Sequence, residues 1–233
     1  MVRLLLDYKV DVNARAIYGW TPLCYAARDG VRFARINNVV QSSPDVARLL
    51  FNHGADVNVR TNSSITPLHI AVRHGNVEGV RVLLEHGANV GAENKEGRTP
   101  LHGAVSNGNV ELVRMLLEHA ADVNARTKDG STPLLIAVEN GSVEVIQMLI
   151  KHGANVDVED EERRTLLHRA TRNGSVELTC MLFEHGADVN RRTKDGSTPL
   201  LAAAGYRSCS YDSEKLMGCS VVHVDIEGTS CLF

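Results

Sequence analysis

Residues 94–126 read NKEGRTPLHGAVSNGNVELVRMLLEHAADVNAR, which we interpret as one structural unit of two short helices. Thr99 and Pro100 form a helix start, because a threonine hydroxyl caps free amide groups and proline suits the first helical position. Three apolar residues follow at helical spacing: Leu101, Ala104 and Val105. Gly108 ends this helix in a tight turn, and a second helix runs to His119. A unit this small cannot bury enough surface to fold alone, so it needs neighbours of its own kind.

The helix start and the end of the second helix recur along the chain with a period of 33 residues. The helix start recurs at Thr66, Thr99, Thr132, Thr165 and Thr198, and also at Thr21. The end of the second helix recurs at His53, His86, His119, His152 and His185. With its TPLH and HGADVN motifs in register, the chain resembles ankyrin-repeat proteins over roughly residues 2–205. The resemblance implies an all-α ankyrin-repeat solenoid of stacked antiparallel helix pairs with β-hairpin fingers.

The period divides the chain into repeats and two irregular ends. We expect a half repeat (second helix only) at 1–13, repeat one at 14–60 with a 12-residue insertion at 31–42, repeats two to five at 61–93, 94–126, 127–159 and 160–192, the start of a degenerate sixth repeat at 193–205, and a divergent tail at 206–233. The half repeat would leave leucines exposed at the end of the array. This predicts either a fragment of a longer array or an edge covered by a partner.

The insertion in repeat one allows two interpretations. Thr21 and Thr66 lie 45 residues apart, which is 12 more than the period of 33. A surface loop would be tolerated because closure entropy grows slowly with loop length. A binding loop is the alternative, since long loops are often functional.

Two positions depart from the glycine pattern. Ala120 stands where the other second helices are followed by glycine, and a left-handed alanine there costs about 1 kcal/mol. Arg163 replaces the glycine of the finger turn, and Leu166 replaces the helix-starting proline. We expect Ala120 to adopt the left-handed conformation.

A search for chemistry finds no catalytic, cofactor-binding or metal-binding motif. The chain has no phosphate-binding glycine loop, no nucleophile elbow and no His-Glu-x-x-His pair. The histidines that end successive second helices lie one helix spacing apart, ~8–10 Å, which is too far to share a zinc ion. Their imidazoles suit the negative end of a helix instead. The tail residues Cys209, Cys219, Cys231 and His223 lack the paired spacing of a zinc site.

Composition narrows the possible partners. A net charge of −3 gives no basic footprint for nucleic acid, and no run of 18 apolar residues predicts a membrane span. Five cysteines without paired spacing favour reduced thiols in an intracellular protein, in the cytoplasm or the nucleus. We therefore expect a protein partner of unknown identity, no nucleic acid and no membrane.

The family resemblance also implies where a partner would bind. In ankyrin-repeat proteins the fingers and the exposed ends of the first helices line a groove that grips folded proteins. Transferred by motif position, the partner-binding residues are Tyr18, Trp20, Arg28, Ile65, Arg73, Lys95, Arg98, Lys128, Glu139, Arg164 and Arg172. Trp20 and Tyr18 stand out because aromatic residues and arginine dominate binding hot spots. The alternative for Trp20 is that it packs on the adjacent finger or covers the incomplete first unit.

These observations predict a non-catalytic protein–protein interaction scaffold that binds a partner on its concave ankyrin surface. An alternative is an ankyrin-repeat segment of a larger regulatory or signalling protein whose effector domain lies outside this chain. The irregular ends of the array motivate that alternative.

Overall fold

The computed structural model describes residues 10–29, 34–36, 39–41 and 43–205. The chain divides into two compact units, Met1–Asn155 and Val156–Phe233, which are described separately. Most of the expected half repeat and the whole tail, with its cysteines and His223, lie outside the described residues.

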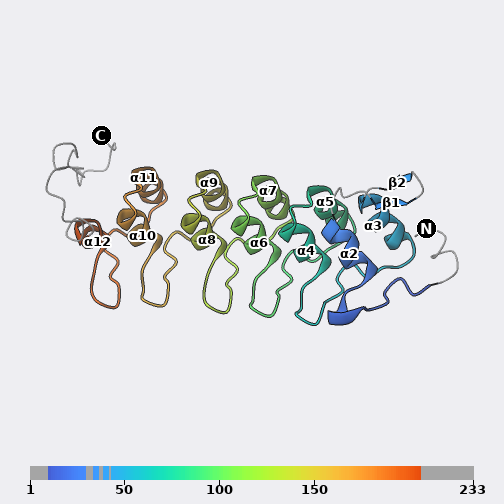
Figure 1. Cartoon of the computed structure of the whole chain (residues 1–233). Helices are drawn as coiled ribbons and strands as arrows, with labels where there is room; N and C mark the ends of the chain where they lie inside the picture. Colours follow the sequence, from blue (N-terminus) through green and yellow to red (C-terminus); the bar gives the residue numbers. More distant parts are fainter. Residues whose placement is uncertain (1–9, 30–33, 37–38, 42, 206–233) are drawn as a thin grey trace. The chain divides into compact units, whose positions relative to one another are not determined.

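The first unit consists of paired antiparallel helices. Its elements are the short 3-10 helix η1 (Ile17–Gly19), α2 (Pro22–Asp29), β1 (Ala34–Ile36), β2 (Val39–Gln41), α3 (Ser43–Asn52), α4 (Pro67–Arg73), α5 (Val77–Glu85), α6 (Pro100–Ser106), α7 (Val110–Glu118), α8 (Pro133–Glu139) and α9 (Val143–Lys151). The first helices α2, α4, α6 and α8 pack side by side in one layer, and α3, α5, α7 and α9 form a second layer on them (Figure 1). The second unit contains α10 (Leu166–Arg172), α11 (Val176–Glu184) and α12 (Pro199–Gly205), with α10 packed on both others. The predicted all-α fold of stacked helix pairs is confirmed.

The first helices begin as the sequence predicts. At α4, Thr66 Oγ1 accepts the N–H of His69, and Pro67 occupies the first turn. The predicted apolar stripe of α6 is fully buried, with Leu101, Ala104 and Val105 each at 0% exposure. Burying a leucine side chain contributes about 1.5–3 kcal/mol, so packing between repeats rather than helix propensity stabilises these short helices.

The second helices end in the predicted manner. Each terminal histidine places Nδ1 2.8–2.9 Å from the carbonyl oxygen four residues earlier, at Leu49, Val82, Met115, Met148 and Met181. Each imidazole therefore provides a hydrogen-bond partner for a backbone carbonyl group at the end of its helix. Ala120 has φ +61°, which confirms its left-handed conformation, and Arg163 has φ +60° in its finger turn.

A small hairpin lies between α2 and α3, inside the stretch interpreted as an insertion. Strands β1 and β2 are antiparallel, with Ala34 opposite Gln41 and Ile36 opposite Val39. The sequence analysis did not predict these strands.

Each repeat begins with a finger, a tight turn before its first helix. We number the fingers one to six: residues 16–20, 61–65, 94–98, 127–131, 160–164 and 193–197. Two backbone hydrogen bonds close each turn, as from Asn94 N–H to Arg98 O at 3.0 Å and from Gly97 N–H to Asn94 O at 3.1 Å. Long strand ladders are absent from the described fingers, and a single bridge between Glu159 and Thr165 flanks finger five.

Candidate protein-binding surface

Backbone hydrogen bonds hold neighbouring fingers in register within each unit. In the first unit Asn62 N–H donates to Tyr18 O at 2.9 Å, and Lys128 N–H donates to Glu96 O at 3.0 Å. In the second unit Lys194 N–H donates to Glu162 O at 3.0 Å. These bonds use main-chain atoms only, so side chains at the finger tips can change without loosening the frame.

Histidines in the first turn of the first helices tie these helices to the next finger. His69 Nε2 lies 3.0 Å from Arg98 O, while its Nδ1 accepts the N–H of Thr66 at 3.3 Å. Because Nδ1 accepts and a carbonyl oxygen cannot donate, Nε2 carries the proton and the imidazole is neutral. His102 makes the same contacts with Thr99 and Ser131, as does His168 in the second unit with Thr165 and Ser197. These contacts tie each of the three first helices to the finger that follows it.

Burial shapes the charge of these histidines. It lowers the pKa of His69 more strongly than the hydrogen bond to Arg98 raises it. The pKa of His102 is lowered for the same main reason, against the opposing hydrogen bond to Ser131. Both rings therefore stay neutral and act as structural links.

The predicted binding residues are accessible to different degrees. The more exposed ones are Tyr18, Arg28, Arg73, Lys95, Lys128, Glu139 and Arg172. The half-buried ones are Trp20, Ile65, Arg98 and Arg164. Their role in binding stays a prediction.

Trp20 belongs to a cluster within its own repeat. Its ring centroid lies 5.1 Å from that of Tyr25, and the two planes are tilted by 53°. The Arg28 guanidinium carbon lies 5.9 Å from the Trp20 ring centroid and 5.4 Å from that of Tyr25. The structure therefore places Arg28 beside Trp20. Tyr25, which is 41% exposed, was missed.

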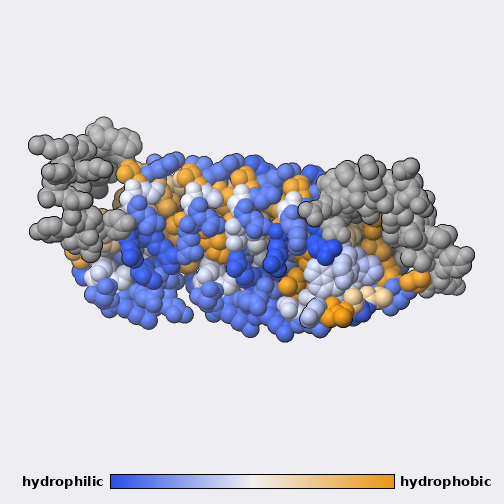
Figure 2. Space-filling model, in the orientation of Figure 1, coloured by the Kyte–Doolittle hydropathy of each residue, from blue (hydrophilic) through white to orange (hydrophobic). Residues whose placement is uncertain are grey.

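The tip of finger one differs from the other tips. Ile17 and Tyr18 are 79% and 74% exposed. The corresponding positions in fingers two to four are occupied by Asn62 and Ser63, Lys95 and Glu96, and Lys128 and Asp129. Figure 2 shows this contrast in the first unit, where apolar colouring interrupts a hydrophilic row of finger tips. The tip is therefore apolar and aromatic where its counterparts are polar.

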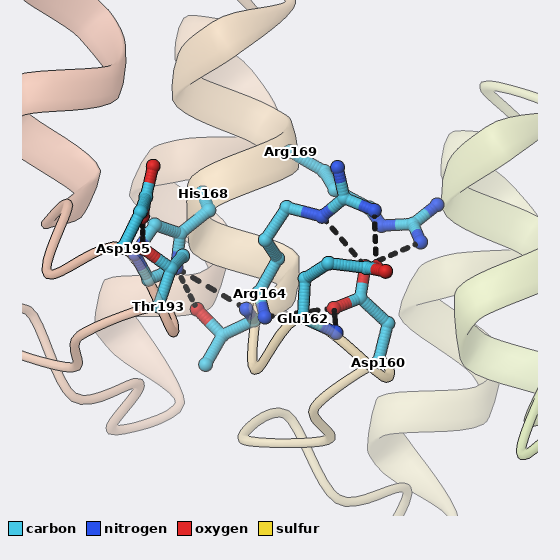
Figure 3. A network of polar contacts seen from close by, with 8 residues as sticks. Asp160, Glu162, Arg164, His168, Arg169, Thr193 and Asp195 are labelled. Carbon is cyan, nitrogen blue, oxygen red and sulfur yellow. Dashed lines mark hydrogen bonds and ion pairs between the residues drawn. The ribbon is translucent and has the colours of Figure 1, made fainter.

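In the second unit an ion-pair network surrounds finger five (Figure 3). Arg164 Nε contacts Asp160 Oδ2 at 2.8 Å, and its Nη2 contacts Glu162 Oε2 at 2.7 Å. Arg169 Nη2 also reaches Asp160 Oδ2, at 3.1 Å. Burial alone would raise the pKa of Asp160, but hydrogen bonds from Arg164 and Arg169 outweigh it and lower the pKa. This network was not predicted from the sequence, which names Arg164 only as a candidate binding residue.

Other finger carboxylates are also held ionised. The Thr127 hydroxyl donates to Asp129 and lowers its pKa, and Thr193 does the same for Asp195 in the second unit. These aspartates shape the turns of their own fingers. They are available as fixed negative charges but not as proton donors near neutral pH.

Neither a metal site nor a membrane span emerges from the described residues. No group of three or more His, Cys, Asp or Glu is arranged there to hold a metal ion. Within the same part of the chain, every helix is too short or too polar to cross a membrane. Cys24 is buried and Cys180 is half-buried.

Comparisons with known proteins agree with this architecture. A family model described as ankyrin repeats in three copies matches residues 36–127, 121–193 and 155–217. Among solved structures, the chain is similar to the ankyrin repeat domain of Bcl-3, described as a unique member of the IkappaB protein family. That similarity has a TM-score of 0.73 and 32% sequence identity, and it covers 87% of this chain and 86% of the other. Comparison with curated proteins gave no match.

Proposed function

The chain belongs to the ankyrin-repeat family, and we propose that it is a non-catalytic scaffold that binds a partner protein on its concave ankyrin surface, formed by the fingers and the exposed ends of the first helices. Ankyrin repeats are a protein–protein interaction module. The similarity to the Bcl-3 repeat domain supports a role in binding rather than in catalysis.

One observation carries the proposal: the buried packing residues are the same from repeat to repeat, whereas the side chains of the fingers differ. The packing leucines Leu68, Leu101 and Leu134 occupy one repeat position and are each at most 1% exposed. At the last finger position, by contrast, Trp20, Ile65, Arg98 and Ser131 differ in size, polarity and charge. A frame closed by main-chain hydrogen bonds tolerates such changes, so this face is free to match a partner.

The proposal is tested by affinity capture and mass spectrometry. The test variant combines Lys95→Ala, Lys128→Ala and Glu139→Ala on the proposed face. A control variant with the same charge change combines Arg114→Ala, Lys151→Ala and Glu118→Ala, which are exposed on the second helices. We expect the test variant to lose proteins that wild type and control both retain. Identical capture by all three would contradict binding on this face.

A further inference from the structure

We propose that finger one and α2 form the anchoring site for an acidic protein segment that carries an aromatic or aliphatic side chain. This rests on the proposed protein-binding function and names the chemistry of the partner. The site is made of Ile17, Tyr18, Trp20, Tyr25 and Arg28, which we call the aromatic–arginine patch.

The composition of the patch is the first support. Tryptophan, tyrosine and arginine carry most of the binding energy at protein interfaces. Repeat one provides them at positions that other repeats of the first unit fill differently. The position of Tyr25 is taken by Ile70, Gly103 and Ile136, of which Ile70 is buried. Exposed apolar residues occurring singly are ordinary, but the patch gathers several on one finger and its helix.

The rigidity of the patch is the second support. Finger one is closed by a hydrogen bond from Ala16 N–H to Trp20 O at 2.7 Å and is tied to finger two through Tyr18 O. Tyr18 keeps φ +68°, a conformation that a tyrosine rarely adopts. Because these rings are already positioned, a partner would lose little entropy in ordering them.

The surrounding charge identifies the partner. Across the finger and first-helix segments 14–29 and 60–74, the charged side chains are Arg15, Arg28, Arg60, Arg73 and Asp29. Four arginines against one aspartate make this region basic, although the whole chain has a net charge of −3. The Arg15 side chain donates to the main-chain carbonyl of Arg60, and the Arg60 side chain donates to that of Glu93. Neither of these contacts involves a carboxylate, so neither neutralises the charge of the arginine. The region would attract carboxylates and repel a basic segment.

The two features combine in one binding arrangement. The rings of Trp20 and Tyr25 supply apolar contact area for a side chain of the partner. Arg28 lies beside both rings and adds a positive charge next to this apolar surface, which attracts a carboxylate of the partner. Arg28 thus links the apolar and the charged halves of the patch.

The test selects binding peptides without assuming a partner. A displayed library of random peptides is panned on the full chain, and the enriched peptides are titrated while fluorescence is followed. Trp20 is the only tryptophan, so its emission reports on the patch. We expect enriched peptides to combine Asp or Glu with an aromatic or aliphatic residue and to change that emission. Arg28→Glu should weaken them about ten- to hundredfold, whereas Arg114→Glu on α7 should not.

Several results would overturn the proposal that the aromatic–arginine patch binds an acidic segment. Enrichment of basic peptides, absence of enrichment, or unchanged affinity in Arg28→Glu would each do so, provided that the variant melts like wild type. Tighter binding of a single-stranded oligonucleotide at Trp20 would also contradict it. If enriched peptides are lost in Lys128→Glu but kept in Arg28→Glu, the patch is wrong while protein binding by the fingers survives. Affinity capture decides the general function separately.

Discussion

At the scale of single residues, Ala120 is a measurable local fault. It adopts φ +61° at a position where Gly54, Gly87 and Gly153 have φ of +84°, +79° and +86°. An L-residue pays for this conformation with a contact between its Cβ and the backbone. We predict that Ala120→Gly stabilises the protein by about 1 kcal/mol, since relief of strain outweighs the added freedom of the unfolded chain. Urea unfolding followed by circular dichroism measures the change.

The reverse substitution provides the control. A Cβ added at Gly153 meets no atom within 4 Å, so Gly153→Ala would introduce only the backbone strain. It should destabilise by a similar amount. A lower midpoint for Ala120→Gly, or no effect of Gly153→Ala, would show that the conformation carries no cost.

Individual residues were predictable where the repeats could be compared with one another. The conformation of Ala120 follows from the glycines at the same position, and the ties of His69 and His102 follow from the shared helix start. Contacts between positions that vary were not predictable. Tyr25 beside Trp20 and Arg164 on Asp160 each occur in one repeat, so no other repeat reveals them.

At the scale of elements, asparagine side chains link the loops that follow the second helices of successive repeats. We call the pair of hydrogen bonds that each asparagine makes a clamp. The Nδ2 groups of Asn13, Asn58 and Asn124 donate to the carbonyls of Gly54, Gly87 and Gly153 at 3.0–3.2 Å. The Oδ1 atoms of the same asparagines accept backbone N–H groups at 2.8–2.9 Å. The donors stand two residues after each glycine and are Asp56, Asn89 and Asn155. In repeat two the position of the clamping asparagine is occupied by Gly91, which has no side chain to make the clamp. Within the first unit, the junction that lacks the clamp is therefore the one that faces Ala120.

We predict that Gly91→Asn restores the missing clamp and stabilises the first unit by about 1–2 kcal/mol, from two hydrogen bonds and reduced unfolded-state entropy. The backbone is already arranged for it, because Gly91 N–H bonds to Asn89 Oδ1 at 2.9 Å, as Asn58 N–H bonds to Asp56 Oδ1. An added Cβ would lie 3.5 Å from Asn89 Oδ1, an ordinary contact. Thermal unfolding compares this variant with Gly91→Ala, which gains only the entropic part. Equal midpoints for the two variants would rule out the clamp.

The elements also show where sequence reasoning stopped. The helix pairs recur, so their caps and buried faces could be assigned from one unit and transferred to the rest. The hairpin of β1 and β2 occurs once and has no counterpart in the other repeats. Asn37 and Asn38 stand between the strands in the sequence and favour a turn, but the pairing register depends on contacts that a periodic pattern does not contain.

At the scale of the whole molecule, stability is approximately a sum over repeats and the interfaces between neighbours. Each neutral histidine contributes to one such interface within its unit. Cys24 and Leu135 hold the same position in repeats one and four, so the chain itself shows that a residue without an imidazole can stand there. The interfaces therefore differ in their response to pH although they share one backbone arrangement.

This difference predicts a pH dependence with a definite sign. His69 and His102 have pKa values below the ordinary 6.5, chiefly because they are buried. As the pH falls below 6.5, the unfolded chain binds protons that the folded chain does not, so the free energy of unfolding decreases until the pH passes the folded pKa values. The decrease is at most about 1.4 kcal/mol per pH unit for each histidine. Above 6.5 these two residues contribute no slope.

Replacing both histidines by leucine, as in repeat four, isolates their part of the effect. His69→Leu with His102→Leu should have lower stability near neutral pH, because Thr66 and Thr99 lose their imidazole partners. Its free energy of unfolding should then fall less steeply than that of wild type between about pH 6.5 and pH 5. Urea titrations at a series of pH values measure both slopes. Parallel slopes would mean that the imidazoles have the same pKa in the folded and unfolded chain. The conclusion that neutral histidines link the repeats would then be wrong.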